Sequence, residues 1–160
     1  MELLCLIRFA HLGQGPMLVW EAVEHFLTGL PDASGGLIHQ EDLQLLCVFS
    51  DPVMALQLLS DTLQAGESEG FAISAALAQG VKSQATLASS LAGFTEGSIE
   101  TLYDLAATAT LQEVAISGKL SSLIKLAAPT FWPRFEAIKP ASTARVRSLL
   151  VMSPIRFVPN

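Results

Sequence analysis

The sequence has little charge for its length. Of its 160 residues only 15% are Asp, Glu, Lys or Arg, whereas 51% are hydrophobic, an apolar balance for a globular domain. A chain of this size is long enough to bury a substantial core, so we expect one domain over residues 1–160. The surplus of apolar side chains predicts that some of them lie in an interface, and we therefore expect a dimer.

Long apolar runs are also missing. A membrane-spanning helix needs roughly 18 or more apolar residues, and Arg8, Asp51 and Lys125 interrupt the longest candidates. The N-terminus contains Glu2 and Arg8 and lacks a small-residue cleavage site, so no secretory signal is expected. These absences predict a cytoplasmic protein without a membrane span.

Basic residues are few, and the formal net charge is -6. Binding to nucleic acid or to an anionic membrane requires clustered Lys and Arg, so we expect neither partner. The basic residues that do occur gather late in the chain, where a solvated face of a terminal hairpin is expected: Arg134, Lys139, Arg145, Arg147 and Arg156.

The chain has only two cysteines, Cys5 and Cys47, and both lie in apolar runs typical of strands. No metal-ligand spacing includes them, so we expect two reduced core thiols. Their strands would be neighbours in a ferredoxin-like sheet, which makes a disulfide geometrically conceivable but not expected in the cytoplasm. Walker and Rossmann glycine loops and a Gly-x-Ser-x-Gly elbow are absent as well, so these nucleotide and nucleophile motifs are excluded.

Strand and helix patterns alternate along the first half of the chain. Residues 3–9 are nearly continuously apolar, which is typical of a strand covered on both faces. Pro16 opens a helix with apolar residues at helical spacing, and Asp51 with Pro52 begins a second helix as N-cap and first residue. The first helix is expected to bury Val19, Trp20, Val23, Phe26 and Leu27, with Glu21, Glu24 and His25 facing away, and the second to bury Leu56, Leu59 and Leu63.

The order of these elements predicts an α+β fold with a ferredoxin-like βαββαβ core. Pro31, Asp32 and the pair Gly35-Gly36 are expected to end the first helix. A hairpin of residues 37–39 and 44–49 and a strand at residues 70–78 complete the core. The C-terminal extension is expected to contain helices at residues 97–110 and 119–128 and strands at residues 114–116, 135–138 and 146–152.

One segment resembles a known family. Residues 98–117 read SIETLYDLAATATLQEVAIS and align without a gap with the pattern a-V-N-x-A-A-R-L-a-x-L-A-x-x-G-E-I-x-V-S of class III adenylate/guanylate cyclase catalytic domains. The like residues are Ile99, Leu105, Ala106, Ala109, Glu113, Val114, Ile116 and Ser117. The resemblance implies that the family Asn that orients the ribose falls on Glu100, and the Arg that stabilises the pentavalent phosphorus falls on Asp104. Both replacements put negative charge where a triphosphate would lie.

Four further segments resemble the family in the same order, at residues 3–13, 38–52, 71–81 and 135–139. The resemblance places His11 at the first metal-binding Asp, Leu43 at the second, and His39 at the base-recognising Lys. It also implies active sites built across a head-to-tail dimer. The vestigial nucleotide-cleft positions are therefore His11, His39, Leu43, Glu100 and Asp104.

Several polar groups have alternative interpretations. His39, Glu41 and Asp42 could hold a divalent metal or form a solvated turn, and a one-residue bulge could bring Asp42 to the metal position. Without a second carboxylate at His11, the two-metal mechanism would still lack half its ligands. His11 itself could coordinate a metal, act as a base, or cap a core strand, and Glu21 with His25 at i and i+4 forms a weak surface pair or a site.

These losses predict a catalytically inactive, degenerate cyclase-like domain that needs no cofactor or metal. It would act in dimerisation or regulation of a cytoplasmic signalling protein, as a homodimer or with a partner signalling domain. The alternative is a ligand-sensing module that binds a small molecule in the vestigial nucleotide cleft. A third hypothesis, an active enzyme with unfamiliar chemistry, is the least supported by the residues.

Overall fold

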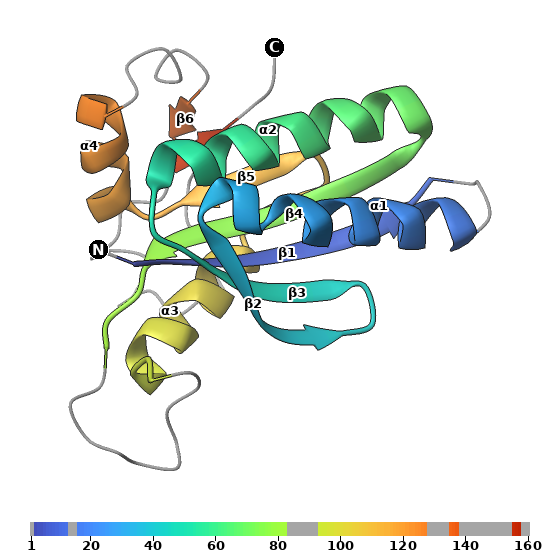
Figure 1. Ribbon diagram of the computed structural model, residues 1–160. Helices are drawn as coiled ribbons and strands as arrows, with labels where there is room; N and C mark the ends of the chain where they lie inside the picture. The colour runs from blue at the N-terminus through green and yellow to red at the C-terminus, as the bar shows by residue number, and fades with distance from the viewer. Residues whose placement is uncertain (1, 13–15, 83–92, 128–134, 138–154, 158–160) are drawn as a thin grey trace.

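The computed structural model describes residues 2–12, 16–82, 93–127, 135–137 and 155–157 (Figure 1). These residues form one mixed sheet and four α-helices. The strands are β1 (Leu3–His11), β2 (Gly35–Glu41), β3 (Gln44–Phe49), β4 (Phe71–Gln79), β5 (Glu113–Ile116), β6 (Phe135–Ala137) and β7 (Ile155–Phe157). The helices are α1 (Pro16–Gly29), α2 (Pro52–Glu69), α3 (Glu96–Ala106) and α4 (Gly118–Ala127), with a short 3-10 helix η1 (Pro31–Ala33).

The sheet has the strand order β2-β3-β1-β4-β5-β7-β6. Its first four strands are mutually antiparallel, and with α1 and α2 they form the predicted ferredoxin-like βαββαβ core. β5 adds to β4 in parallel, and β7 and β6 follow in antiparallel pairing. The predicted α+β class is confirmed.

Helices cover the two faces of the sheet unequally. We call the side covered by α1, α2 and α4 the helical face, and the side covered by α3 the α3 face; Figure 1 shows α1 and α2 on one side and α3 on the other. Side chains such as Ile7, Phe26 and Leu59 form the core of the helical face. Leu4, Leu6 and Leu102 belong to a smaller core on the α3 face. Among the described residues, no helix is both long and apolar enough to cross a membrane.

The starts of the helices follow the sequence signals more closely than their ends. Asp51 caps α2, because its Oδ1 accepts the Val53 N–H at 2.8 Å. The expected apolar stripe of α1 is wrong at Trp20, which is 43% exposed; Ala22 takes a place in the core instead. The glycine pair does not end α1 either: the helix stops at Gly29, before η1, and Gly35 and Gly36 already belong to β2.

Two glycines are needed for close packing. A Cβ atom on Gly35 would lie 2.8 Å from the Phe49 ring, and one on Gly80 would lie 2.4 Å from the Phe94 ring. Phe94 is 1% exposed and packs in the core of the α3 face, just before α3 begins. Gly80 thus lets the chain cross closely beneath the start of that helix.

In the second half, α3 ends at Ala106, earlier than the expected residue 110. The chain turns there, because the Thr108 hydroxyl donates to the Leu105 carbonyl at 2.7 Å and Gln112 takes a positive φ of 67° before β5. α4 and β5 agree with expectation to within one residue. The strand expected at residues 146–152 lies outside the described residues.

The two cysteines are direct cross-strand neighbours. Cys5 of β1 pairs with Cys47 of β3 in register, and both are free thiols buried in the core of the helical face. This confirms that their strands are adjacent.

Candidate functional site

β1 ends beside the turn of the β2–β3 hairpin. The Phe9 N–H donates to the Leu43 carbonyl at 2.9 Å, which continues the antiparallel ladder one residue before the start of β3 at Gln44. His11, the last residue of β1, is exposed, and the half-buried Leu43 side chain packs against the core of the helical face. Two of the five positions that the resemblance assigns to the cleft, His11 and Leu43, therefore lie at one corner of the sheet.

The other three cleft positions lie apart from this corner. His39 is exposed on the edge strand β2, where it pairs with Leu46 and so shares its face, the α3 face. Glu100 and Asp104 lie one turn apart on α3; Glu100 is exposed, whereas Asp104 is half-buried and its Oδ2 atom is buried. Within one chain, the five positions therefore lie in three places: the corner at the end of β1, the edge strand β2 and helix α3.

The residues at the corner do not fit a two-metal centre. His11 offers one imidazole and Leu43 offers no ligand, whereas two metal ions are normally held by shared carboxylates. A one-residue bulge beside Asp42 could have brought this carboxylate to the metal position. Asp42 instead occupies the hairpin turn with a φ of 51°, and the bulge of the hairpin lies in β2 between Leu37 and His39. Within the described ranges, no three His, Cys, Asp or Glu side chains converge on a point that could hold a metal.

A row of polar residues crosses the α3 face of the sheet next to this corner. Register pairing aligns one residue from each of five adjacent strands: Glu41, Gln44, Arg8, Ser74 and Glu113. Residues paired across strands project from the same face, so this row interrupts an otherwise apolar surface. At its far end the row is buried, because Ser74 and Glu113 are only 8% and 7% exposed.

Arg8 is the residue of this row that sequence reasoning missed. Its Nε donates to Gln44 Oε1 at 2.9 Å, and the half-buried guanidinium lines an open hollow of about 390 Å³ together with Glu41, Asp42 and Leu43. The signal was available, because Arg8 interrupts an apolar strand, and a charge in that place must find a polar neighbour. The hollow places one fixed cation beside two carboxylates.

No known sequence-family profile matches the chain, and no curated protein does. Solved structures do. The guanylate cyclase domain of RhGC from Catenaria anguillulae, in complex with GTP, superposes with a TM-score of 0.65 over 99% of this chain and 96% of its own, at 8% identity. An adenylate cyclase from Trypanosoma brucei in its monomeric state gives 0.65, with coverage of 96% and 87% and 11% identity. A dimeric guanylyl cyclase domain from Blastocladiella emersonii gives 0.58, with coverage of 99% and 97% and 11% identity.

This chain has the class III nucleotide cyclase fold. In this cyclase-like domain, α3, the turn after it and β5 contain most of the segment, residues 98–117, that resembles the family pattern. Glu113, one of the matching residues, begins β5 on the α3 face, and its Oε1 accepts the Thr110 N–H at 3.1 Å. The carboxylate therefore holds the turn between α3 and β5, which is a structural role.

Proposed function

We propose that this cyclase-like domain forms no cyclic nucleotide and acts by association, as a dimerising or regulatory domain of a signalling protein. The observation that supports this proposal is the corner where the Phe9 N–H meets the Leu43 carbonyl. The two positions that the resemblance assigns to metal-binding aspartates, His11 and Leu43, both lie at this corner. Cyclisation of a nucleoside triphosphate depends on metal ions that neutralise its phosphates, and these two positions offer an imidazole and an apolar side chain instead of carboxylates.

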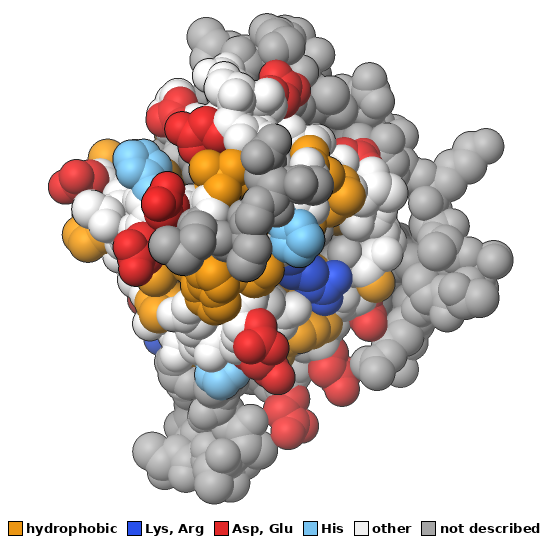
Figure 2. All heavy atoms as spheres, turned by 90° about the vertical axis from the view of Figure 1, so that its right-hand side faces the viewer, with side chains coloured by type: hydrophobic (Ala, Val, Ile, Leu, Met, Phe, Trp, Pro, Cys, Tyr) orange, Lys and Arg blue, Asp and Glu red, His pale blue; other side chains and the backbone are white. Residues whose placement is uncertain are grey.

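Exposed apolar side chains around the first helix and the hairpin support association. Leu12, Trp20 and Leu37 are 51%, 43% and 44% exposed. Figure 2 views the end of the molecule at which β1 ends and the hairpin turns. Hydrophobic side chains gather in the middle of this view, and acidic side chains lie around them. A patch of this kind marks an interface more often than a solvated surface.

The direct test is an activity assay with ATP and with GTP, each with magnesium and with manganese. We expect no cyclic nucleotide above a buffer control. Product formation that disappears in the His11→Ala variant would overturn the proposal, because it would show that the corner is catalytic.

Association is tested separately by sedimentation. The Trp20→Glu variant should associate more weakly than the native chain, and the Glu24→Gln variant should associate equally well. A strict monomer at high micromolar concentration would contradict a role in dimerisation.

The carboxylates on α3 allow a second test of the cleft. Glu100 and Asp104 repel a polyphosphate if they face the cleft, as like charges at i and i+4 lie on one side of a helix. The variant with Glu100→Asn and Asp104→Arg should therefore bind metal-free ATP more tightly than the native chain. Equal binding would show that the cleft is not where the resemblance places it.

The hollow beside Arg8 favours the alternative function, a small-molecule sensor. A guanidinium held by Gln44 can bind a planar acceptor in a fixed orientation. A thermal-shift screen would detect such a ligand, because a ligand at 100 times its Kd stabilises the fold by about 2.7 kcal/mol. A hit that is lost in Arg8→Met would favour the sensor over the purely associating domain.

A further inference from the structure

Charge is segregated along this chain. No Lys or Arg occurs between Arg8 and Lys82, and this interval contains α1 and α2 complete. The two helices together expose only carboxylates as charged groups, apart from His25 of α1. The exposed surface of α1 and α2 is therefore acidic, without a Lys or Arg of its own.

A groove runs between these two helices. Its volume is about 320 Å³, and Glu21 of α1 and Asp61 and Glu69 of α2 lie around it. Apolar groups line it as well, among them Leu58 and Phe71. An apolar lining with acidic groups suits an apolar side chain next to a Lys or Arg, whose methylene stem can pack on apolar surface while its charge meets a carboxylate.

α4 presents a surface of that complementary kind. Lys119, Ser122, Leu123 and Leu126 follow at i, i+3, i+4 and i+7 and are all exposed, so they form one ridge on the helix. Leu126 is 83% exposed, the highest value among the exposed large hydrophobic residues of the described chain, and Leu123 is 39% exposed. The ridge combines a cation with apolar side chains, as the groove requires.

We propose that the α4 ridge of one copy docks into the α1–α2 groove of a second copy. Lys119 would meet the carboxylates of the groove, and Leu123 and Leu126 would cover its apolar lining. This contact uses a surface other than the apolar patch around Trp20 and does not depend on whether the domain is catalytic.

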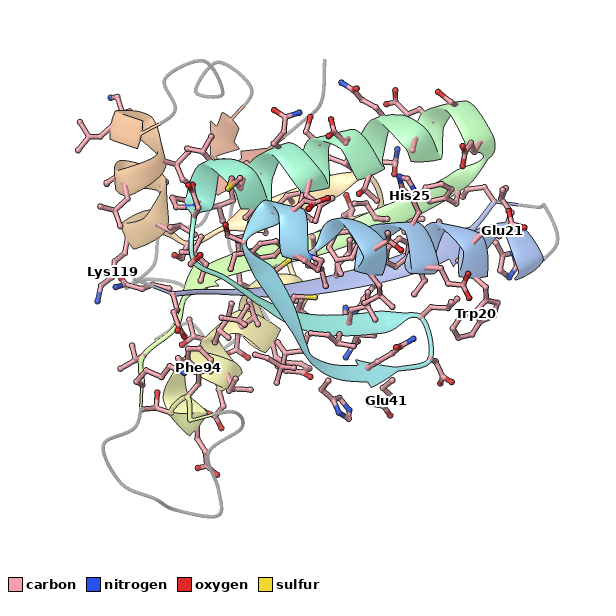
Figure 3. All side chains as sticks on the ribbon, viewed as in Figure 1. Trp20, Glu21, His25, Glu41, Phe94 and Lys119 are labelled. Carbon is pink, nitrogen blue, oxygen red and sulfur yellow. The ribbon has the colours of Figure 1, made fainter. Side chains whose placement is uncertain are left out.

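The contact must form between molecules. The groove lies at the start of β4, beside Phe71, whereas α4 follows β5, whose last residue pairs with Leu77 of β4. Six residues of strand separate these points by roughly 20 Å, and Figure 3 shows Lys119 and the pair Glu21 and His25 towards opposite ends of the ribbon. Two different surfaces at opposite ends make a head-to-tail contact, which extends into chains unless it closes into a ring.

Charge reversals on either surface test the proposal. The groove variant has Glu21→Lys and Asp61→Lys, and the ridge variant has Lys119→Glu and Ser122→Glu, which leaves both leucines in place. Like charges placed against each other oppose docking, so sedimentation should show self-association weakened about tenfold or more in each variant. A mixture of the groove variant and the ridge variant should associate again, because each groove can then bind a ridge of opposite charge.

The matched control is Glu24→Lys with Glu67→Lys, which makes the same charge change on the same two helices at exposed positions outside the groove. It should associate as the native chain does, and circular dichroism verifies the folding of all variants. The proposal is overturned if the native chain stays monomeric, if the control weakens association as much as the groove variant, or if the mixed variants fail to associate. None of these outcomes changes the expected absence of cyclase activity, which is measured separately.

Discussion

The two faces of the sheet differ in what they bury. On the helical face, large side chains such as Phe26, Phe49 and Phe71 fill the space under α1 and α2. On the α3 face, Ala76, Ala78 and Ala115 leave room for one closely packed helix, and the polar row crosses the sheet. The helical face therefore holds most of the large buried side chains, and the α3 face combines a smaller apolar core with polar residues. We expect a charge to cost more stability on the helical face than on the α3 face.

The largest loss of stability is expected when a charge is placed on the helical face instead of the α3 face. Ile7 is fully buried on the helical face and precedes Arg8 of the α3 face. Ile7→Arg buries a charge without a partner, and we expect a loss of about 4 kcal/mol or more in the free energy of unfolding. Arg8→Lys keeps a charge at the next position and should fold normally. Urea denaturation measures both, and equal losses would refute the difference between the faces.

A cavity in the core of the helical face should have the next largest effect. Phe26 is 1% exposed and packs edge-to-face on Phe9, with ring centroids 5.9 Å apart. Phe26→Ala should cost about 3–5 kcal/mol. Trp20→Ala, on the same helix but at a 43% exposed position, should change stability by less than about 1 kcal/mol. The comparison is made at a protein concentration at which the chain is monomeric, and a larger loss at Trp20 would then mean that the fold itself buries this side chain.

Alkaline pH should weaken the helical face through its two thiols. Burial, with the nearby Cys47 as a smaller cause, raises the pKa of Cys5 well above its usual range, and burial raises the pKa of Cys47 to about 12. In the unfolded chain both thiols titrate near the ordinary cysteine pKa of 9.0. The native state therefore keeps protons that the unfolded state loses, and stability falls as the pH rises from 9 towards 12.

At about pH 10 this linkage removes roughly 1.4 kcal/mol per thiol. Denaturation curves recorded below and above pH 9 measure the loss, and Cys47→Ala should reduce the slope by about half. An unchanged slope in that variant would show that other groups cause the alkaline loss.

The smallest effect is expected on the α3 face. Arg8→Ala removes a partly solvated hydrogen bond to Gln44 and should cost about 1 kcal/mol. A double-mutant cycle with Gln44→Ala should give a coupling of roughly 0.5–1 kcal/mol. Strictly additive losses would mean that the pair does not hold the row together.

The sequence predicted the βαββαβ order because periodicity and capping are local signals. Asp51 with Pro52 marked the start of α2, and the helical spacing of Leu56, Leu59 and Leu63 marked its buried face, which the structure confirms. Trp20 was assigned to the core wrongly, because hydrophobicity alone does not show which side of α1 the sheet covers.

The candidate site was less predictable. The contact between the Phe9 N–H and the Leu43 carbonyl follows from the antiparallel order of β1 and β3, and the resemblance singled out His11 and Leu43 near it. The polar row depends on the register of five strands, which no local pattern encodes. Arg8 and Ser74 were therefore single polar interruptions in the sequence and became neighbours only in the sheet.

The long interval without Lys or Arg also determines where trypsin can cleave the chain. Trypsin cleaves after these two residues, so no tryptic site exists between Arg8 and Lys82. A digest of the unfolded chain should release Phe9 to Lys82 as one peptide that contains α1, the hairpin, α2 and β4. Lysine-directed labels will likewise leave residues 9–81 unmodified, and mapping of the surface of this stretch needs reagents that react with carboxylates.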